Sequence, residues 1–148
     1  MQGELGSNEC GCSLFRIYPV RDALRNAWEE SKPGTQDAHE EGGFVLRNFA
    51  GNLEVHRWPK GVQANITVPP HPSCQFKQLD VVFSFHTHPN VSDEFLQEPS
   101  ETDKRSVQED PDLKGALYEG ELVISQENIY LISPNGEVQE LIKTSSFF

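Results

Sequence analysis

The sequence predicts an α+β fold in which a mixed β-sheet is flanked by helices. Two observations lead to this class: apolar residues recur at helical spacing near the amino terminus, and short strand-like runs fill most of the remaining chain around one further helix. The length of 148 residues is typical of one domain. We expect residues 1–13, which are mostly small and polar, to form a flexible tail or the end of a linker, and residues 14–148 to form a single domain.

Two segments carry helix signals. Residues 20–31 have an apolar side at helical spacing and charged residues on the other side, and Pro33-Gly34 ends this helix. A second helix is expected to begin at Ser100, because Asp103 follows this N-cap serine three residues later, and to end at Asp110-Pro111. The apolar side of the first helix consists of Val20, Leu24, Ala27 and Trp28.

Strand signals occupy most of the remaining chain. The run 81–85 is the most apolar and predicts a central strand that is buried on both faces. Residues 50–52 and the segment Pro134-Asn135-Gly136 predict turns between neighbouring strands. The other expected extended segments are 44–49, 53–58, 62–68, 117–125, 128–133 and 137–142.

The charge excludes some classes of function. Twelve Lys and Arg residues against 23 Asp and Glu residues give a net charge of −11, which repels nucleic acids and anionic membranes, so we expect neither as a partner. No apolar run is long enough for a transmembrane helix, and the first residues lack the features of a secretory signal. We therefore expect a protein that is cytoplasmic or exported as part of a larger carrier.

The segment Phe85-His86-Thr87-His88-Pro89 carries the clearest chemical signal. His86 and His88 are two residues apart at the end of a strand, so both imidazoles lie on one face. Asp103, in the first turn of the following helix, can add a carboxylate oxygen if the intervening loop folds back. Two nitrogens and one oxygen leave a fourth tetrahedral position open, which is the donor set of a catalytic Zn²⁺ site.

This pattern resembles a known family. His86-x-His88-Pro89 followed by Pro99-Ser100-x-x-Asp103 is similar to the signature of the JAMM metalloproteases, also called JAB or MPN-plus domains. The resemblance implies a cytidine-deaminase-like architecture, zinc bound by His86, His88 and Asp103, and Ser100 stabilising the tetrahedral intermediate. It also implies hydrolysis of an amide, either an isopeptide bond to a ubiquitin-like tail or an ordinary peptide bond.

The family also uses a glutamate as general acid and base, ahead of a glycine and an early strand. Glu40-Glu41-Gly42-Gly43 resembles that segment, and its Glu-x-x-Gly register selects Glu40. Glu41 is the competitor. Without the resemblance, either residue would be read as a solvated surface acid, as most glutamates are.

A narrower resemblance concerns the biological role. The Gly-Gly strand opening, the long loop at residues 89–99 and the carboxyl-terminal strands look like bacterial JAB-type domains of Rhs and other polymorphic toxins. The resemblance implies an effector with a protein or peptide substrate and, if the chain is a toxin, an immunity protein as partner. The enlarged loop is expected to act as a lid or a substrate wall.

Other interpretations stay open. The same fold could serve as a catalytically silent binding or scaffold module, or the hydrolase could act on cell-wall peptide. The cysteines at positions 10, 12 and 74 could form part of a metal site, but free thiols are the better interpretation. His39, His56 and His71 show no partner spacing, and His39 is expected to be a bystander next to Glu40.

Overall fold

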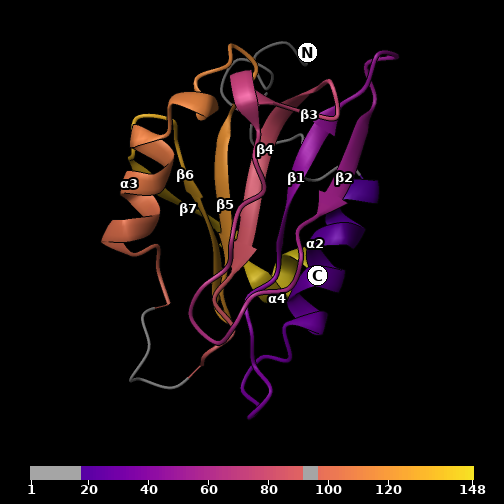
Figure 1. Ribbon diagram of the computed structural model, residues 1–148. Coiled ribbons are helices and arrows are strands. Elements are labelled where there is room, and N and C mark those ends of the chain that lie inside the picture. Colours follow the sequence, from indigo (N-terminus) through magenta and orange to yellow (C-terminus); the bar gives the residue numbers. More distant parts are fainter. Residues whose placement is uncertain (1–17, 92–96) are drawn as a thin grey trace, which may run out of the picture.

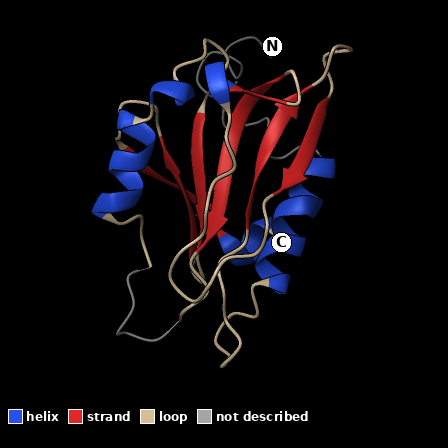
Figure 2. Cartoon of the chain, in the orientation of Figure 1, coloured by secondary structure: helices blue, strands red, loops and turns tan. Residues whose placement is uncertain are grey.

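A seven-stranded mixed β-sheet with helices on both faces forms the protein (Figures 1 and 2). The structure is a computed structural model and describes residues 18–91 and 97–148, so the expected tail at residues 1–13 lies outside the described residues. The α-helices are α2 (Tyr18–Glu30), α3 (Glu101–Glu109) and α4 (Thr144–Phe147). The strands are β1 (Gly42–Arg47), β2 (Leu53–Arg57), β3 (Gln75–Phe76), β4 (Leu79–Thr87), β5 (Gly120–Ile124), β6 (Asn128–Ile132) and β7 (Val138–Lys143).

The strand order places β4 in the middle of the sheet. The order is β2-β1-β4-β5-β6-β7, and the short β3 pairs with the beginning of β4. β4 and β5 run parallel, whereas every other neighbouring pair is antiparallel. The predicted class, α+β with a mixed sheet flanked by helices, is thereby confirmed.

One face of the sheet packs against α2 and α4. The apolar side of α2 contributes Val20, Leu24 and Ala27, all fully buried, as its helical spacing predicted. Phe83 and Phe85 point from β4 into this layer. Because side chains alternate along a strand, Ser84 and His86 must point to the opposite face.

The opposite face is covered by α3 and by the long connection between β2 and β3 (Figure 1). Val107 of α3 is buried here with Phe44, Trp58 and Tyr118 in a second apolar cluster. His86 is buried on the same face, with its Nε2 3.5 Å from Oδ1 of Asp103 in the first turn of α3. The sheet therefore separates an apolar layer from a layer that contains polar groups.

Two short helices of the 3-10 type lie next to this second layer. They are Pro72–Cys74, just before β3, and Pro111–Leu113, just after α3. The Cys74 thiol is buried and free.

Gly42 allows three elements to meet at the end of β4. It pairs with His86 across the β1–β4 ladder, and its carbonyl accepts a hydrogen bond from the Trp58 backbone. A Cβ at this position would lie 2.6 Å from the carbonyl oxygen of Phe85 and 2.6 Å from the ring of Trp58. Only glycine fits this contact without displacing one of them.

The segment 62–68 is not a strand, which corrects the expectation from its apolar residues. Its only pairing is an isolated bridge in which the Val62 N–H donates to the carbonyl of Asn65, so the chain turns back on itself. The carbonyl of Val62 accepts from the Glu40 N–H instead of from a neighbouring strand. Both backbone groups of Val62 are thus bonded outside the sheet.

Element boundaries differ elsewhere by a few residues. The strand expected from residue 117 begins at Gly120, because residues before it form a turn. The two-residue β3 and the four-residue α4 were not predicted, since both depend on packing against the sheet rather than on local pattern. Among the described residues, no helix is long and apolar enough to cross a membrane.

Candidate metal centre

The end of β4 positions the two histidines. His86 is in the strand, and His88 follows one residue after its end. The His88 N–H still donates to the carbonyl of Ile124 on β5, at 2.8 Å, so the extended ladder continues past the strand. This continuation keeps both imidazoles on the α3 face, as the spacing of two predicted.

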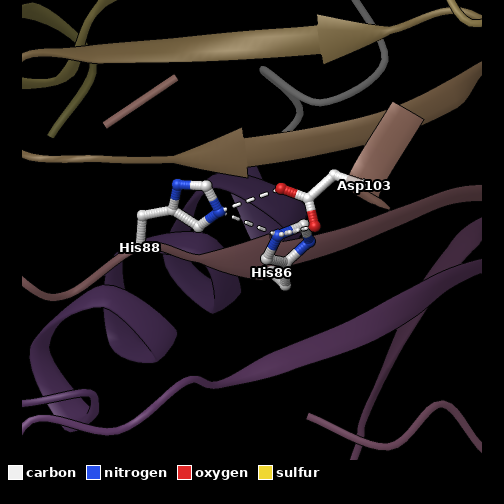
Figure 3. A group of neighbouring side chains, drawn as sticks. All are labelled: His86, His88 and Asp103. Atoms are coloured by element: carbon white, nitrogen blue, oxygen red, sulfur yellow. Dashed lines mark hydrogen bonds and ion pairs between the residues drawn. The ribbon is translucent and has the colours of Figure 1, made fainter. Parts of the chain in front are cut away.

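The first turn of α3 delivers Asp103. The Ser100 side chain accepts from the Asp103 N–H at 3.0 Å, and the Ser100 N–H donates to Oδ2 of Asp103 at 2.9 Å. This reciprocal pair is the capping box that the sequence predicted. It fixes the Asp103 carboxylate at the start of the helix, where the carboxylate faces the two rings (Figure 3).

The three side chains converge on one point. Nε2 of His86 and Nε2 of His88 are 3.3 Å apart, Nε2 of His88 lies 3.1 Å from Oδ2 of Asp103, and Nε2 of His86 lies 3.5 Å from Oδ1 (Figure 3). A tetrahedral ion with bonds of about 2.0 Å has ligand atoms about 3.3 Å apart. The group could therefore hold a metal ion, as its donor atoms already have the spacing that coordination requires.

The other ring nitrogens are already engaged. Nδ1 of His86 is hydrogen-bonded to the Glu121 carboxylate, and Nδ1 of His88 faces the carbonyl of Gln97 at 3.2 Å. Both acceptors require an N–H at Nδ1. In each neutral ring, Nε2 then carries a lone pair directed at the other ring and at Asp103. Lone pairs that face each other repel, and a cation between them removes that repulsion.

The pKa shifts indicate the same preference for positive charge. Burial alone would lower the pKa of His86, but the charges of Glu121 and Asp103 hold it well above its usual value. Burial alone would raise the pKa of Asp103, but hydrogen bonds from the two rings hold it far below its usual range. A proton on His86 can thus occupy the place that a metal ion would take.

A cavity of about 310 Å³ opens beside the cluster. Its lining includes His86 and Asp103, together with Glu40, Ser100 and Trp58. Glu40 precedes β1 and is buried, and the charges of His86 and His88 act on its carboxyl. Burial raises the pKa of Glu40, while those two histidines oppose the rise. The cavity is thus lined by a buried carboxyl group together with His86 and Asp103 of the cluster.

Glu41 has a different environment. Its carboxylate accepts from Nε2 of His39 at 2.6 Å and from the Arg57 guanidinium at 2.6 Å. Its backbone joins β4 through the N–H and side-chain hydroxyl of Thr87. Both carboxylate oxygens are therefore occupied by structural partners, and Glu41 does not line the cavity. His39, expected to be a bystander, is one of those partners.

The hydroxyl hydrogen of Ser100 remains available for a hydrogen bond next to the cavity. Its Oγ accepts from the Asp103 N–H, so the hydroxyl hydrogen is not used in the capping box. Because Ser100 lines the cavity, this hydrogen can be donated to a group bound there. Ser100 thus orients the Asp103 carboxylate through its backbone N–H, and its hydroxyl can donate a hydrogen bond into the cavity.

Sequence reasoning missed Glu121 and the carbonyl of Gln97. Glu121 lies on β5, opposite Ser84 in the parallel register, and this pairing brings it to His86. A charged residue within the apolar strand Gly120–Ile124 was the available signal. The centre of the expected lid, residues 92–96, lies outside the described residues. Its described neighbour Gln97 is tied to His88 and to the Asn90 carbonyl.

The comparisons with known proteins add no assignment. No protein-family model, curated protein or solved structure matches the chain. The candidate metal centre therefore rests on the geometry of this chain alone.

Proposed function

We propose that the protein is a zinc-dependent hydrolase that cleaves an amide bond at the His86, His88 and Asp103 cluster. The observation that carries the proposal is the approach of two Nε2 atoms and a carboxylate to within 4.8 Å of one another, while each Nδ1 is engaged elsewhere. Two nitrogens and one carboxylate are the donor set of hydrolytic zinc sites. The similarity of these residues to the JAMM signature supports an amide as the substrate.

The residues around the cluster have complementary roles in this proposal. A bound Zn²⁺ would supply a Lewis acid and a water of lowered pKa. Glu40 accepts the proton of the attacking water, for which its raised pKa is suited because it lies closer to neutrality. Glu40 then delivers the proton to the leaving nitrogen. Ser100 donates its hydroxyl hydrogen to the oxygen on which negative charge develops.

The residues that line the cavity surround the proposed reaction site. Trp58 closes one side, and Thr102 and Ser106 place hydroxyl groups on the side of α3. An extended peptide that entered between α3 and the connection after β2 would pass Glu40 and Ser100 together. The narrower resemblance adds a biological role to this proposal: the protein acts as a toxin, and an immunity protein is its partner. The proposed chemistry does not depend on that role.

The proposal is tested with zinc content and peptide cleavage on the same preparations. The probe is a peptide library digested with the zinc-loaded protein, in which new amino termini are identified by mass spectrometry. Glu40→Gln should bind one zinc ion per chain and lose about 10²- to 10⁴-fold in cleavage rate. Wild-type cleavage by the variant would reject Glu40 as the base. Stoichiometric zinc without cleavage of any probe by the wild type would favour the binding-module interpretation.

A further inference from the structure

The face of His86 that points away from the cluster contacts a buried chain of three polar side chains. Nδ1 of His86 is bonded to Oε2 of Glu121, and Oε1 of Glu121 accepts from the Ser84 hydroxyl at 2.8 Å. The Ser84 oxygen lies 2.7 Å from the Tyr118 hydroxyl. The four groups lie on β4, on β5 and in the turn before β5, so the sheet itself aligns them.

The direction of these hydrogen bonds is determined. The Ser84 hydrogen is donated to Glu121, so Tyr118 must donate to the Ser84 oxygen. Burial and the charge of Glu121 hold the pKa of Tyr118 well above its usual value, so the phenol keeps its proton. Every donor in the chain thus points toward Glu121, which acts only as an acceptor.

Burial of the Glu121 carboxylate lowers the stability of the fold unless hydrogen-bond donors compensate for the lost hydration. Ser84 is 1% exposed and Tyr118 is 5% exposed, and the Glu121 side chain is 13% exposed. A carboxylate at such a position is destabilising unless several donors satisfy it. The neighbours Leu122 and Val123 are apolar, so a residue such as Val or Ile at position 121 would match the rest of the strand.

We infer that Glu121 is a positioning residue for metal binding: held by Ser84 and Tyr118, it keeps the proton of His86 on Nδ1 and directs Nε2 at the centre. The inference rests on the proposed zinc site. A carboxylate behind a ligand imidazole fixes the tautomer and ring orientation and increases the basicity of the ligand nitrogen. Among the residues that the structure describes, the neutral Gln97 carbonyl is the group facing Nδ1 of His88, so the two histidines of the cluster are supported unequally.

The test compares zinc affinities, measured by competition with a chromophoric chelator. Glu121→Gln keeps the size of the side chain but lacks the charge, and we expect it to bind zinc about 10- to 100-fold more weakly. Ser84→Ala should show a smaller loss, and Tyr118→Phe the smallest, in the order of their distance along the chain. If Glu121→Gln unfolds, Ser84→Ala still decides the question, because the inference requires a loss there.

A matched control separates this role from general destabilisation. Asp110→Asn changes another, part-buried carboxylate–histidine pair, in which Oδ2 of Asp110 lies 2.7 Å from Nε2 of His71, outside the cluster. We expect its zinc affinity to match the wild type. A second readout is the Nδ1 proton of His86 in the NMR spectrum of the zinc-loaded protein. It should lie far downfield in the wild type and move upfield in Glu121→Gln.

The outcomes distinguish the two proposals. A wild-type protein that binds no zinc rejects the proposed function itself. A wild type that binds zinc tightly, with equal affinity in Glu121→Gln and an unmoved Nδ1 resonance, overturns the role of Glu121 and leaves the zinc site intact. Equal losses in Glu121→Gln and Asp110→Asn would assign the effect to stability and likewise overturn the inference.

Discussion

Two buried histidine–carboxylate regions lie on the same face of the sheet and differ in one respect. At His71, Nδ1 faces the carbonyl of Pro69 at 2.7 Å, and Nε2 faces Asp110 at 2.7 Å. At His86, Nδ1 faces Glu121, but Nε2 faces another imidazole nitrogen and the Asp103 carboxylate. Burial is similar in both regions, since the His71 and His86 side chains are 10% and 5% exposed.

The difference teaches what separates a structural histidine from a candidate ligand. Both ring nitrogens of His71 face oxygen atoms of the protein, so neither can bind an ion without losing a contact within the fold. His39 repeats this pattern between the Asp37 carbonyl and Glu41. At the cluster, the two Nε2 atoms face each other as well as the Asp103 carboxylate, and the contact between the two nitrogens is favourable only with a proton or a metal ion between them.

Replacing one histidine in each region should give the largest difference in zinc affinity between two variants. We expect His88→Ala to weaken zinc binding by more than about 100-fold, because the loss of a ligand exceeds the 10- to 100-fold effect of outer contacts. His71→Ala should retain wild-type zinc affinity and instead lose about 1 to 3 kcal/mol of unfolding free energy. Equilibrium dialysis and urea unfolding measure the two quantities. Unchanged zinc binding in His88→Ala would contradict the cluster.

The pH dependence of the unfolding free energy of the metal-free protein should distinguish the two regions by a smaller amount. The raised pKa of His86 contributes stability that is complete below about pH 6.5 and is lost as pH rises through the folded-state value. The lowered pKa of Asp103 contributes stability that is present above about pH 3.9 and is lost as pH falls through its folded-state value. Metal-free protein should therefore be most stable between these limits.

We expect its unfolding free energy to fall as the pH rises from 6 to 9, because the unfolded chain loses the His86 proton at a lower pH than the folded protein does. Asp103→Asn should flatten this dependence, whereas Asp110→Asn, in the other region, should keep it. Zinc-loaded wild type should show the opposite sign, because zinc binds the deprotonated histidines and protons compete with it at low pH. Urea unfolding at four pH values distinguishes these cases, and equal slopes in the two variants would contradict the link to the cluster.

The sequence predicted the convergence of His86, His88 and Asp103, but not the residues that contact them from behind. His86, His88 and Asp103 were found because a strand period and a capping box are local patterns. Glu121 was not found, because its contact with His86 depends on the parallel register of β4 and β5, across 35 positions of chain. Only a strand order, which local periodicity does not contain, brings these two residues together.

The fold shows the same limit. The helix and most strands followed from hydrophobic period, and Ser100 began α3 as expected. The segment 62–68 has apolar residues suited to a strand, but its backbone is used in the Val62–Asn65 bridge and in holding Glu40. The short α4 forms from Thr-Ser-Ser-Phe, a sequence with little helix propensity, because Phe147 is buried against the core.

The smallest effects on the unfolding free energy should come from the adjacent acids Glu40 and Glu41, and they should have opposite signs. Glu41→Gln weakens the contacts with His39 and Arg57 and should lower the unfolding free energy by about 1 to 2 kcal/mol, while cleavage activity stays within about threefold. Burial raises the pKa of Glu40, so its ionised form is disfavoured in the folded state at pH 8. Glu40→Gln removes that cost and should raise stability by about 0.5 kcal/mol. Parallel urea titrations at pH 8 measure both changes. A stability loss in both variants would place Glu40 in a structural role like that of Glu41, and would remove the reason for assigning the proton transfer to Glu40.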